Sequence, residues 1–158
     1  MQESLKIYVD RLKNGEEETI TAKLDPSLFD LKKEDDVSAK EPIQVSGKAY
    51  IAGDFLIVEL DIDTTLTLRC SVCNRAFSFA IHLKQWIHEE PLEDIKHGIF
   101  EYGVVVREAC LLEIPLYPQC GVSLCLHRDE IEKYLKKPSE DSSKQEDKSS
   151  HYYPFADL

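Results

Sequence analysis

The sequence predicts an α+β protein, in which a strongly curved antiparallel sheet or partly closed barrel carries one or two helices in its C-terminal half. Three observations support this fold class. Apolar and polar residues alternate over residues 56–70 and again over 77–83, which is the period of strands with one buried face. Turn signals separate such runs, as hairpins require. Too few helical segments are present to connect parallel strands.

The longest alternating run sets the expected curvature. Its apolar side chains fall on even positions, at Val58, Leu60, Ile62, Leu66 and Leu68. A straight strand over this run would span about 50 Å, which is too long for a small domain. We therefore expect a bend or bulge near Thr64 and Thr65, so that the segment serves two parts of one sheet.

Shorter runs upstream predict further strands. Residues 4–11 and 20–24 alternate on either side of the Asn-Gly pair at 14–15, which is a strong hairpin signal. Another run, 43–51, is separated from the longest run by a Gly-Asp pair at 53–54, which is typical of a turn. The N-terminal half is therefore expected to begin with a hairpin and to continue as strands joined by tight turns.

Two helices are predicted downstream. Residues 103–114 are mostly apolar, and the polar residues that interrupt them fit one narrow helical face better than alternation. The valines at 104–106 favour a strand instead. Pro115 ends this segment, because the residue before a proline avoids the helical conformation. A shorter helix is expected over 129–136.

The length of 158 residues suits one domain followed by a tail. We assign residues 1–136 to a single α+β domain and residues 137–150 to a disordered linker, because this polar stretch cannot bury enough apolar surface. Residues 151–158 are aromatic again and predict a recognition peptide, although folding back onto its own sheet is an equal alternative. The expected partner contacts are Pro154, Phe155 and Leu158.

Net charge and hydropathy argue against some classes of function for this protein. The net charge of −11 disfavours a protein that coats nucleic acid nonspecifically. It leaves room for a local basic patch or for a basic partner such as a ribosomal protein. No run of eighteen apolar residues is present, and the first residues lack the pattern of a signal peptide. A cytoplasmic location without membrane contact is expected.

Five cysteines include two close pairs that suggest a metal site. The pairs are Cys70 with Cys73, between the two longest alternating runs, and Cys120 with Cys125. In a reducing compartment such pairs indicate metal or redox chemistry rather than disulfides. Four thiolates suit one structural zinc, with His127 as a substitute fourth ligand, and two unrelated pairs of thiols are the alternative. Cys110 stands apart in an apolar run and is expected to be a buried small hydrophobe.

The turn that carries the first cysteine pair sits between strands, and Asn74 after it tolerates a left-handed backbone. Thiol redox chemistry normally needs this motif at the start of a helix, so it is the less favoured interpretation. Other catalytic motifs are absent from the sequence, and we expect that the protein is not an enzyme.

Arg69, Arg75 and Arg128 flank the cysteine pairs and are candidates for a local RNA or phosphate contact. Solubilising charge is an equal alternative.

Three segments together resemble a known family. They are Leu-Thr-Leu-Arg-Cys-Ser-Val-Cys-Asn-Arg-Ala-Phe at 66–77, Leu-Glu-Ile-Pro-Leu-Tyr-Pro at 112–118 before a cysteine, and Tyr-Pro-Phe-Ala-Asp-Leu at 153–158. With these segments the chain resembles the YceD-like family, the large ribosomal RNA subunit accumulation proteins, over roughly residues 55–158.

The resemblance implies a non-enzymatic ribosome-biogenesis factor that supports accumulation or processing of large-subunit ribosomal RNA. The implied partner is a ribosomal protein or a large-subunit assembly factor, with ribosomal RNA contacted locally if at all. The alternative is a zinc-stapled protein-interaction adaptor unrelated to ribosomes. The family offers no catalytic residues to assign to this sequence.

Overall fold

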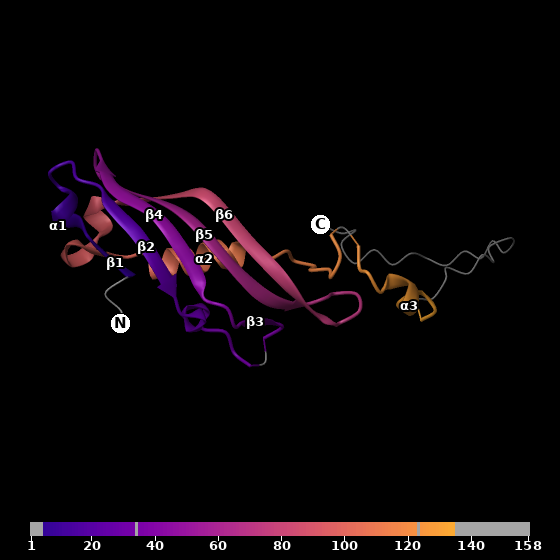
Figure 1. The fold of residues 1–158 in the computed structure, drawn as a ribbon. Helices are drawn as coiled ribbons and strands as arrows, with labels where there is room; N and C mark the ends of the chain where they lie inside the picture. The colour runs from indigo at the N-terminus through magenta and orange to yellow at the C-terminus, as the bar shows by residue number, and fades with distance from the viewer. Residues whose placement is uncertain (1–4, 34, 123, 135–158) are drawn as a thin grey trace, which may run out of the picture.

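The computed structural model describes residues 5–33, 35–122 and 124–134 (Figure 1). Strands dominate this part of the chain, every strand pairing is antiparallel, and the helices are few. The α+β class is therefore confirmed. The predicted linker over 137–150 and the predicted peptide over 151–158 lie outside the described residues, and so do the expected contacts Pro154, Phe155 and Leu158.

Seven strands form two sheets in this part of the chain. The five-stranded sheet runs β2-β4-β5-β3, with β6 paired to β5, and β1 pairs with β7 in a two-stranded sheet. The strands are β1 (Lys6–Tyr8), β2 (Glu18–Leu24), β3 (Val37–Ala39), β4 (Ile43–Ala52), β5 (Phe55–Arg69), β6 (Ala76–Pro91) and β7 (Ile99–Glu101). The α-helices are α1 (Val9–Leu12), α2 (Gly103–Leu112) and α3 (Arg128–Glu132), and the 3₁₀ turns are η2 (Pro26–Phe29), η3 (Leu92–Asp94) and η4 (Lys96–Gly98).

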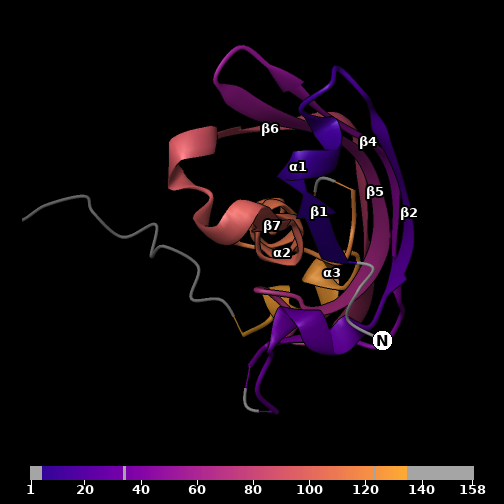
Figure 2. The same cartoon turned by 90° about the vertical axis from the view of Figure 1, so that its left-hand side faces the viewer.

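Strand β5 is the centre of the fold, and its alternation is confirmed. Every even position from Leu56 to Leu68 is buried, whereas most odd positions are not. The buried side chains face α2, which lies against one face of the sheet (Figure 2). Helix α2 contributes Val106, Ala109 and Cys110 to this core. It begins at the predicted residue 103 and ends at Leu112, two residues before the predicted 114. The buried Cys110 is the small hydrophobe that the sequence indicated.

The longest strand does serve two parts of the sheet. One edge of β5 pairs with β4 over 55–63 and with β3 over 66–68, while the other edge pairs with β6. The bulge lies a few residues before the predicted Thr64, where the register between β5 and β6 shifts between Leu60 and Ile62. It forms there because Gln85 has a φ of 52° and its N–H donates to Asp61 at 2.7 Å.

The expected strong curvature or partial barrel is not confirmed. The five-stranded sheet is open, and no described strand closes it into a barrel. A short segment, β3, replaces β4 beside the last residues of β5. The bulge and the exchange of neighbours therefore accommodate the length of β5 in an open sheet.

The predicted N-terminal hairpin is wrong. Strand β1 pairs with β7, and β2 pairs with β4. After Tyr8 the chain turns into α1, whose Val9 and Leu12 are both buried. Two buried residues at helical spacing hold this segment in the core as a helix, so the turn at Gly15 follows a helix rather than a strand.

Helix α3 begins one residue before the predicted start at 129 and ends earlier than predicted, at Glu132. It follows the second cysteine pair, at the end of the molecule that lies away from β1 and α1 (Figure 1). The β5–β6 hairpin reaches the same end, and this brings the two cysteine-bearing segments together.

Candidate metal centre

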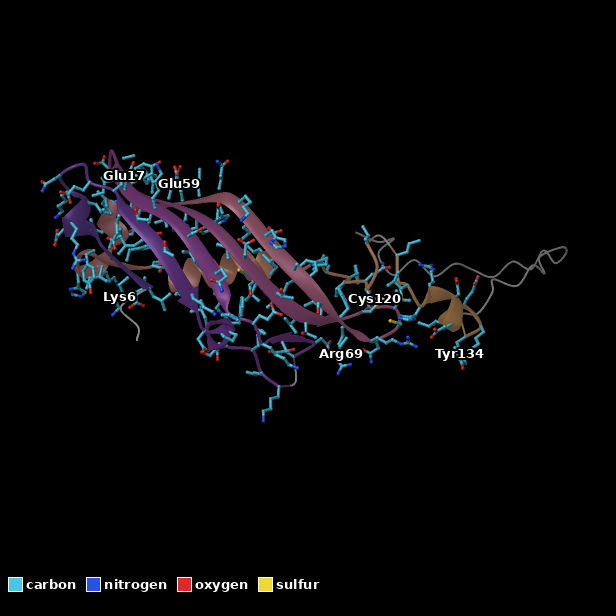
Figure 3. The ribbon with its side chains drawn as sticks, in the orientation of Figure 1. Lys6, Glu17, Glu59, Arg69, Cys120 and Tyr134 are labelled. Carbon is cyan, nitrogen blue, oxygen red and sulfur yellow. The ribbon has the colours of Figure 1, made fainter. Side chains whose placement is uncertain are left out.

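The two cysteine pairs meet at one end of the sheet. Cys70 and Cys73 lie in the turn between β5 and β6, and Cys120 and Cys125 lie in the loop after α2. A backbone hydrogen bond of 2.8 Å, from Ser71 N–H to the carbonyl oxygen of Pro118, ties the turn to the loop. Figure 3 shows Cys120 near Arg69, at the opposite end of the sheet from Lys6 and Glu17.

The sulfur atoms are spaced as a four-coordinate ion requires. All four Sγ atoms lie within 4.8 Å of one another. The Sγ–Sγ distance is 3.9 Å between Cys73 and Cys120 and 3.7 Å between Cys120 and Cys125. A tetrahedral zinc with Zn–S bonds of about 2.3 Å places its sulfurs about 3.8 Å apart. The four cysteines could therefore hold one metal ion, and thiolates select soft or borderline metals.

Local hydrogen bonds shape the first pair. The N–H of Cys70 donates to the carbonyl of Arg75 at 2.9 Å, and the N–H of Asn74 donates to the carbonyl of Cys70 at 2.9 Å. Asn74 has a φ of 59°, which confirms the predicted left-handed residue. This tight turn aims both sulfurs toward the loop, and the Cys70 side chain is buried.

A close backbone approach shapes the second pair. A Cβ atom on Gly121 would lie 1.9 Å from the carbonyl oxygen of Leu124, so only glycine fits this loop. The N–H of Cys125 donates to the side-chain oxygen of Gln119 at 2.8 Å. The N–H of His127 donates to the sulfur of Cys125 at 3.4 Å. Such N–H groups stabilise negative charge on a sulfur.

The thiols of the cluster differ in acidity. Burial by itself raises the pKa of the Cys70 thiol. Backbone N–H groups of Cys73, Val72 and Cys120 outweigh burial, so the pKa of this thiol falls from 9.0 to about 6. Burial raises the pKa of the Cys125 thiol to about 12, and the neighbouring sulfurs add to this shift against the N–H of His127. The Cys70 thiol therefore loses its proton at a lower pH than the Cys125 thiol does.

A lowered thiol pKa is also what the redox interpretation needs at Cys70. The Cys70 side chain is only 2% exposed, however, and its sulfur lies within 4.8 Å of three others. A redox nucleophile must be accessible to its substrate, so the buried position of the Cys70 sulfur suits a metal ligand better than a redox nucleophile. The cysteine outside the cluster is inert, because burial raises the pKa of the Cys110 thiol to about 11.

The predicted alternative ligand, His127, is engaged elsewhere. Its ring nitrogens lie 2.8 and 3.1 Å from Nη1 of Arg75, and its Nδ1 lies 3.4 Å from a carboxylate oxygen of Glu130. The ligand group found in the described part of the chain consists of the four cysteines. His127 therefore supports the loop through its side-chain contacts and does not complete the cluster.

The three arginines proposed for a phosphate contact lie near the cysteines but are not equivalent. Nη2 of Arg75 forms an ion pair with Glu130 at 2.7 Å, which links the first cysteine turn to α3. Arg69 donates to the carbonyl of Asn74 at 3.2 Å, and its Nε lies 3.9 Å from Asp36. Arg128 is exposed at the start of α3. Acidic partners on two of the arginines weaken the case for a phosphate site.

Sequence reasoning missed the residues that support the cluster. Gln119 and Gly121 shape the second loop, and Glu130 closes the contact to the first turn. The glycine directly after Cys120 is the one local signal that could have indicated a tight loop. Gln119 and Glu130 carry no such signal, because their roles depend on atoms brought together by the fold.

Comparison with known proteins adds no assignment, because no protein-family profile, curated protein or solved structure matches this chain. Within the described residues, every helix is too short or too polar to span a membrane.

Proposed function

We propose that Cys70, Cys73, Cys120 and Cys125 bind one structural zinc ion. The observation that carries the proposal is the distance of at most 4.8 Å between any two of the four sulfurs, which come from two segments at least 47 positions apart in the sequence. Four thiolates fill a tetrahedral site and leave no open position for a substrate. The proposed role of the metal is to hold the β5–β6 turn against the loop after α2, without catalysis.

The zinc proposal is tested by metal content in the purified protein. We expect one zinc per chain, and the cobalt-substituted protein should show thiolate-to-metal charge-transfer absorption. Cys73→Ser should remove both signals. Cys110→Ala is the matched control, because this cysteine is buried in the core outside the cluster, and it should keep both. Retention of full zinc content by Cys73→Ser would rule out the shared site.

For the whole protein we propose a non-enzymatic factor that supports accumulation or processing of large-subunit ribosomal RNA. Its support is the resemblance of three segments to the YceD-like family, together with the cysteine cluster, which could hold a structural metal ion. The net charge of −11 favours a basic protein partner over broad RNA contact. The contacts proposed for Pro154, Phe155 and Leu158 extend the same role to the tail.

Depletion of the protein from its cells tests this role. We expect large-subunit ribosomal RNA to fall relative to small-subunit RNA, and wild-type protein and Cys110→Ala to restore the ratio. An unchanged ratio after depletion would exclude the role. A protein lacking residues 151–158 that folds normally but fails to restore the ratio would assign the tail to partner contact.

The alternative function is a zinc-stapled adaptor whose partner is unrelated to ribosomes. The same geometry supports it, because a structural zinc says nothing about the partner. Affinity capture of the intact protein, with the bound RNA sequenced and the bound proteins identified together, separates the two. Ribosomal proteins and assembly factors favour the first function, and one unrelated partner favours the second.

A further inference from the structure

Large apolar side chains point into solvent along the loop that carries the second cysteine pair. We name these residues the knuckle patch: Leu116 (93% exposed), Tyr117 (78%), Val122 (fully exposed), Leu124 (57%) and Leu126 (74%). Five such residues within eleven positions form a concentration that a monomeric soluble protein rarely exposes. They are also not free to collapse, because the cysteine cluster and the tight turn at Gly121 fix the loop.

A groove runs beside the knuckle patch. One wall is the start of β6, from Phe77 to Ala80, and the other consists of Pro115, Tyr117 and the loop residues 119–122. Leu116 and Pro118 instead line a second hollow, beside Leu68 and Arg69. The groove has a volume of about 440 Å³. Phe77 and Phe79 are only partly covered and pack against the core from this wall. The groove therefore offers aromatic surface that is already held in place by the sheet.

The same wall is a sheet edge. Within the described chain, β6 pairs with β5 alone. Its outer edge thus presents backbone N–H and C=O groups, which an extended peptide can pair with as an added strand. Alternate side chains of such a peptide would point toward the groove, because side chains alternate along a strand.

The segment that contains the second cysteine pair is weakly acidic. From 111 to 134 it carries four acidic residues, Glu113, Asp129, Glu130 and Glu132, against Arg128 and Lys133, and Glu130 is already paired with Arg75 of the first cysteine turn. A zinc ion bound by four thiolates would add a charge of about −2. The whole chain carries −11. A bound segment with positive charge therefore gains attraction at this end of the molecule.

We propose that the knuckle patch and the outer edge of β6 bind an extended segment of a basic protein, with apolar side chains at alternate positions and lysine or arginine between them. The proposal deepens the proposed function by defining the surface and the chemistry of the partner, and it rests on that function for the existence of a partner. The apolar side chains fill the groove, and the basic side chains face the acidic surface.

The charges favour this occupant over the others. A second copy of the chain would bring together two molecules of −11 each, which repel. A nucleic acid would need free cations here, but Arg75 is paired with Glu130, and Arg69 is near Asp36. Residues 151–158 of this chain contain an aspartate and no lysine or arginine, so they lack the positive charge that the surface favours.

Selection of random 12-residue peptides by mRNA display, against the zinc-loaded full chain, tests the proposal. We expect enriched peptides in which apolar residues alternate with lysine or arginine. Synthetic copies, followed by fluorescence anisotropy, should bind Tyr117→Ser/Val122→Ser at least about tenfold more weakly than wild type. The control is Ile99→Ser/Val104→Ser, whose residues are 37% and 55% exposed on β7 and α2, and it should stay within about twofold of wild type.

Each contrary result overturns the proposal. Absence of enrichment, enrichment of acidic peptides, or equal binding to the patch variant would reject the surface. Circular dichroism and zinc content must match wild type, which is expected because both substituted side chains are largely exposed. A dimer in sedimentation velocity that Tyr117→Ser/Val122→Ser dissolves would assign the surface to a second copy. A tenfold gain in peptide affinity on removing residues 151–158 would assign it to the chain's own tail.

The failure of this proposal is distinguishable from failure of the proposed function. If peptides bind the patch but depletion leaves the ribosomal RNA ratio unchanged, the role in ribosome biogenesis is wrong and the surface remains. If depletion lowers the ratio and Tyr117→Ser/Val122→Ser restores it fully, the role remains and the surface is wrong.

Discussion

The two ends of this molecule hold their structure by different means. Around β5 and α2, the chain buries a continuous apolar core, in which Leu56, Ile62 and Val106 have no exposed surface. In the loop from Pro115 to Leu126, the large apolar side chains are exposed, and among its described residues Cys125 is the buried one. The loop contacts the first cysteine turn through the sulfur cluster and one backbone hydrogen bond, and the Arg75–Glu130 ion pair links that turn to α3, which follows the loop.

This difference teaches where stability resides. Burial of apolar surface is the main term that favours folding, and the sheet has it without any ligand. The cysteine loop has little of it, so its order depends on whatever binds the four thiolates. We therefore expect the two regions to respond separately to substitutions, because distant regions of a protein open with different free energies.

Loss of a sulfur ligand should have the largest effect, and it should be confined to one region. Cys120→Ser is expected to weaken zinc binding at least about 100-fold, because it removes a direct ligand rather than an outer-shell contact. Competition with a chromogenic chelator measures this affinity. Hydrogen exchange should show loss of amide protection over 115–126 and unchanged protection in β5.

Cys110→Ala serves as the control for the ligand variant and should leave zinc affinity unchanged. Equal loss of protection in the sheet and in the loop of Cys120→Ser would show that the two regions form one cooperative unit. In that case the comparison made here would be wrong.

A substitution in the core should give the converse pattern. Ile62→Ala removes a fully buried side chain of β5 and should cost about 2–5 kcal/mol in the free energy of unfolding. Urea denaturation followed by the fluorescence of Trp86, which lies in β6, measures it. Zinc content at low urea should stay at the wild-type value. Ile87→Ala, at a side chain that is 54% exposed, should cost less than about 1 kcal/mol.

In the metal-free protein, we expect the stability of the cysteine loop to depend on pH more strongly than that of the sheet. The pKa of the Cys70 thiol is lowered from 9.0 to about 6, so its thiolate stabilises the folded loop at pH 9, and this contribution is lost as the pH falls through 6. The Cys125 thiol, whose pKa is raised to about 12, has the opposite effect above pH 9. Titration of the Cys70 ¹³Cβ shift in metal-free protein should give a midpoint near 6, and a midpoint near 9 would contradict the proposed hydrogen bonds.

The smallest expected change in stability concerns a buried hydroxyl group without a hydrogen-bond partner in the part of the chain that the structure describes. The hydroxyl of Thr64 is buried in β5 and has no hydrogen-bond partner among the described residues. Thr64→Val removes this unsatisfied group with little change in shape, and it should be neutral or stabilising by about 1 kcal/mol. Urea denaturation measures the change, with Thr65→Val on the opposite face as the comparison. A loss of more than about 1 kcal/mol would show that the hydroxyl does have a partner.

The sequence by itself determined the features that depend on local pattern. Alternation over 56–70 was sufficient to place β5 and its buried face, since a period of two has one interpretation over so long a run. The turn after Cys73 and the helix ending before Pro115 were predicted because backbone preferences act within a few residues. The same local rules failed at the N-terminus, where Val9 continues the alternation of Leu5 and Ile7 but also has helical spacing to Leu12.

Only the tertiary structure decided which distant segments meet. The pairing of β1 with β7 joins residues more than 90 positions apart, and no local pattern encodes such a partner. The cysteine spacings allowed one shared site or two separate ones, and the β5–β6 hairpin decided it by reaching the loop after α2. The exposure of Leu116, Val122 and Leu126 was also hidden in the sequence, because an apolar residue is typical of a core until the fold leaves nothing to cover it.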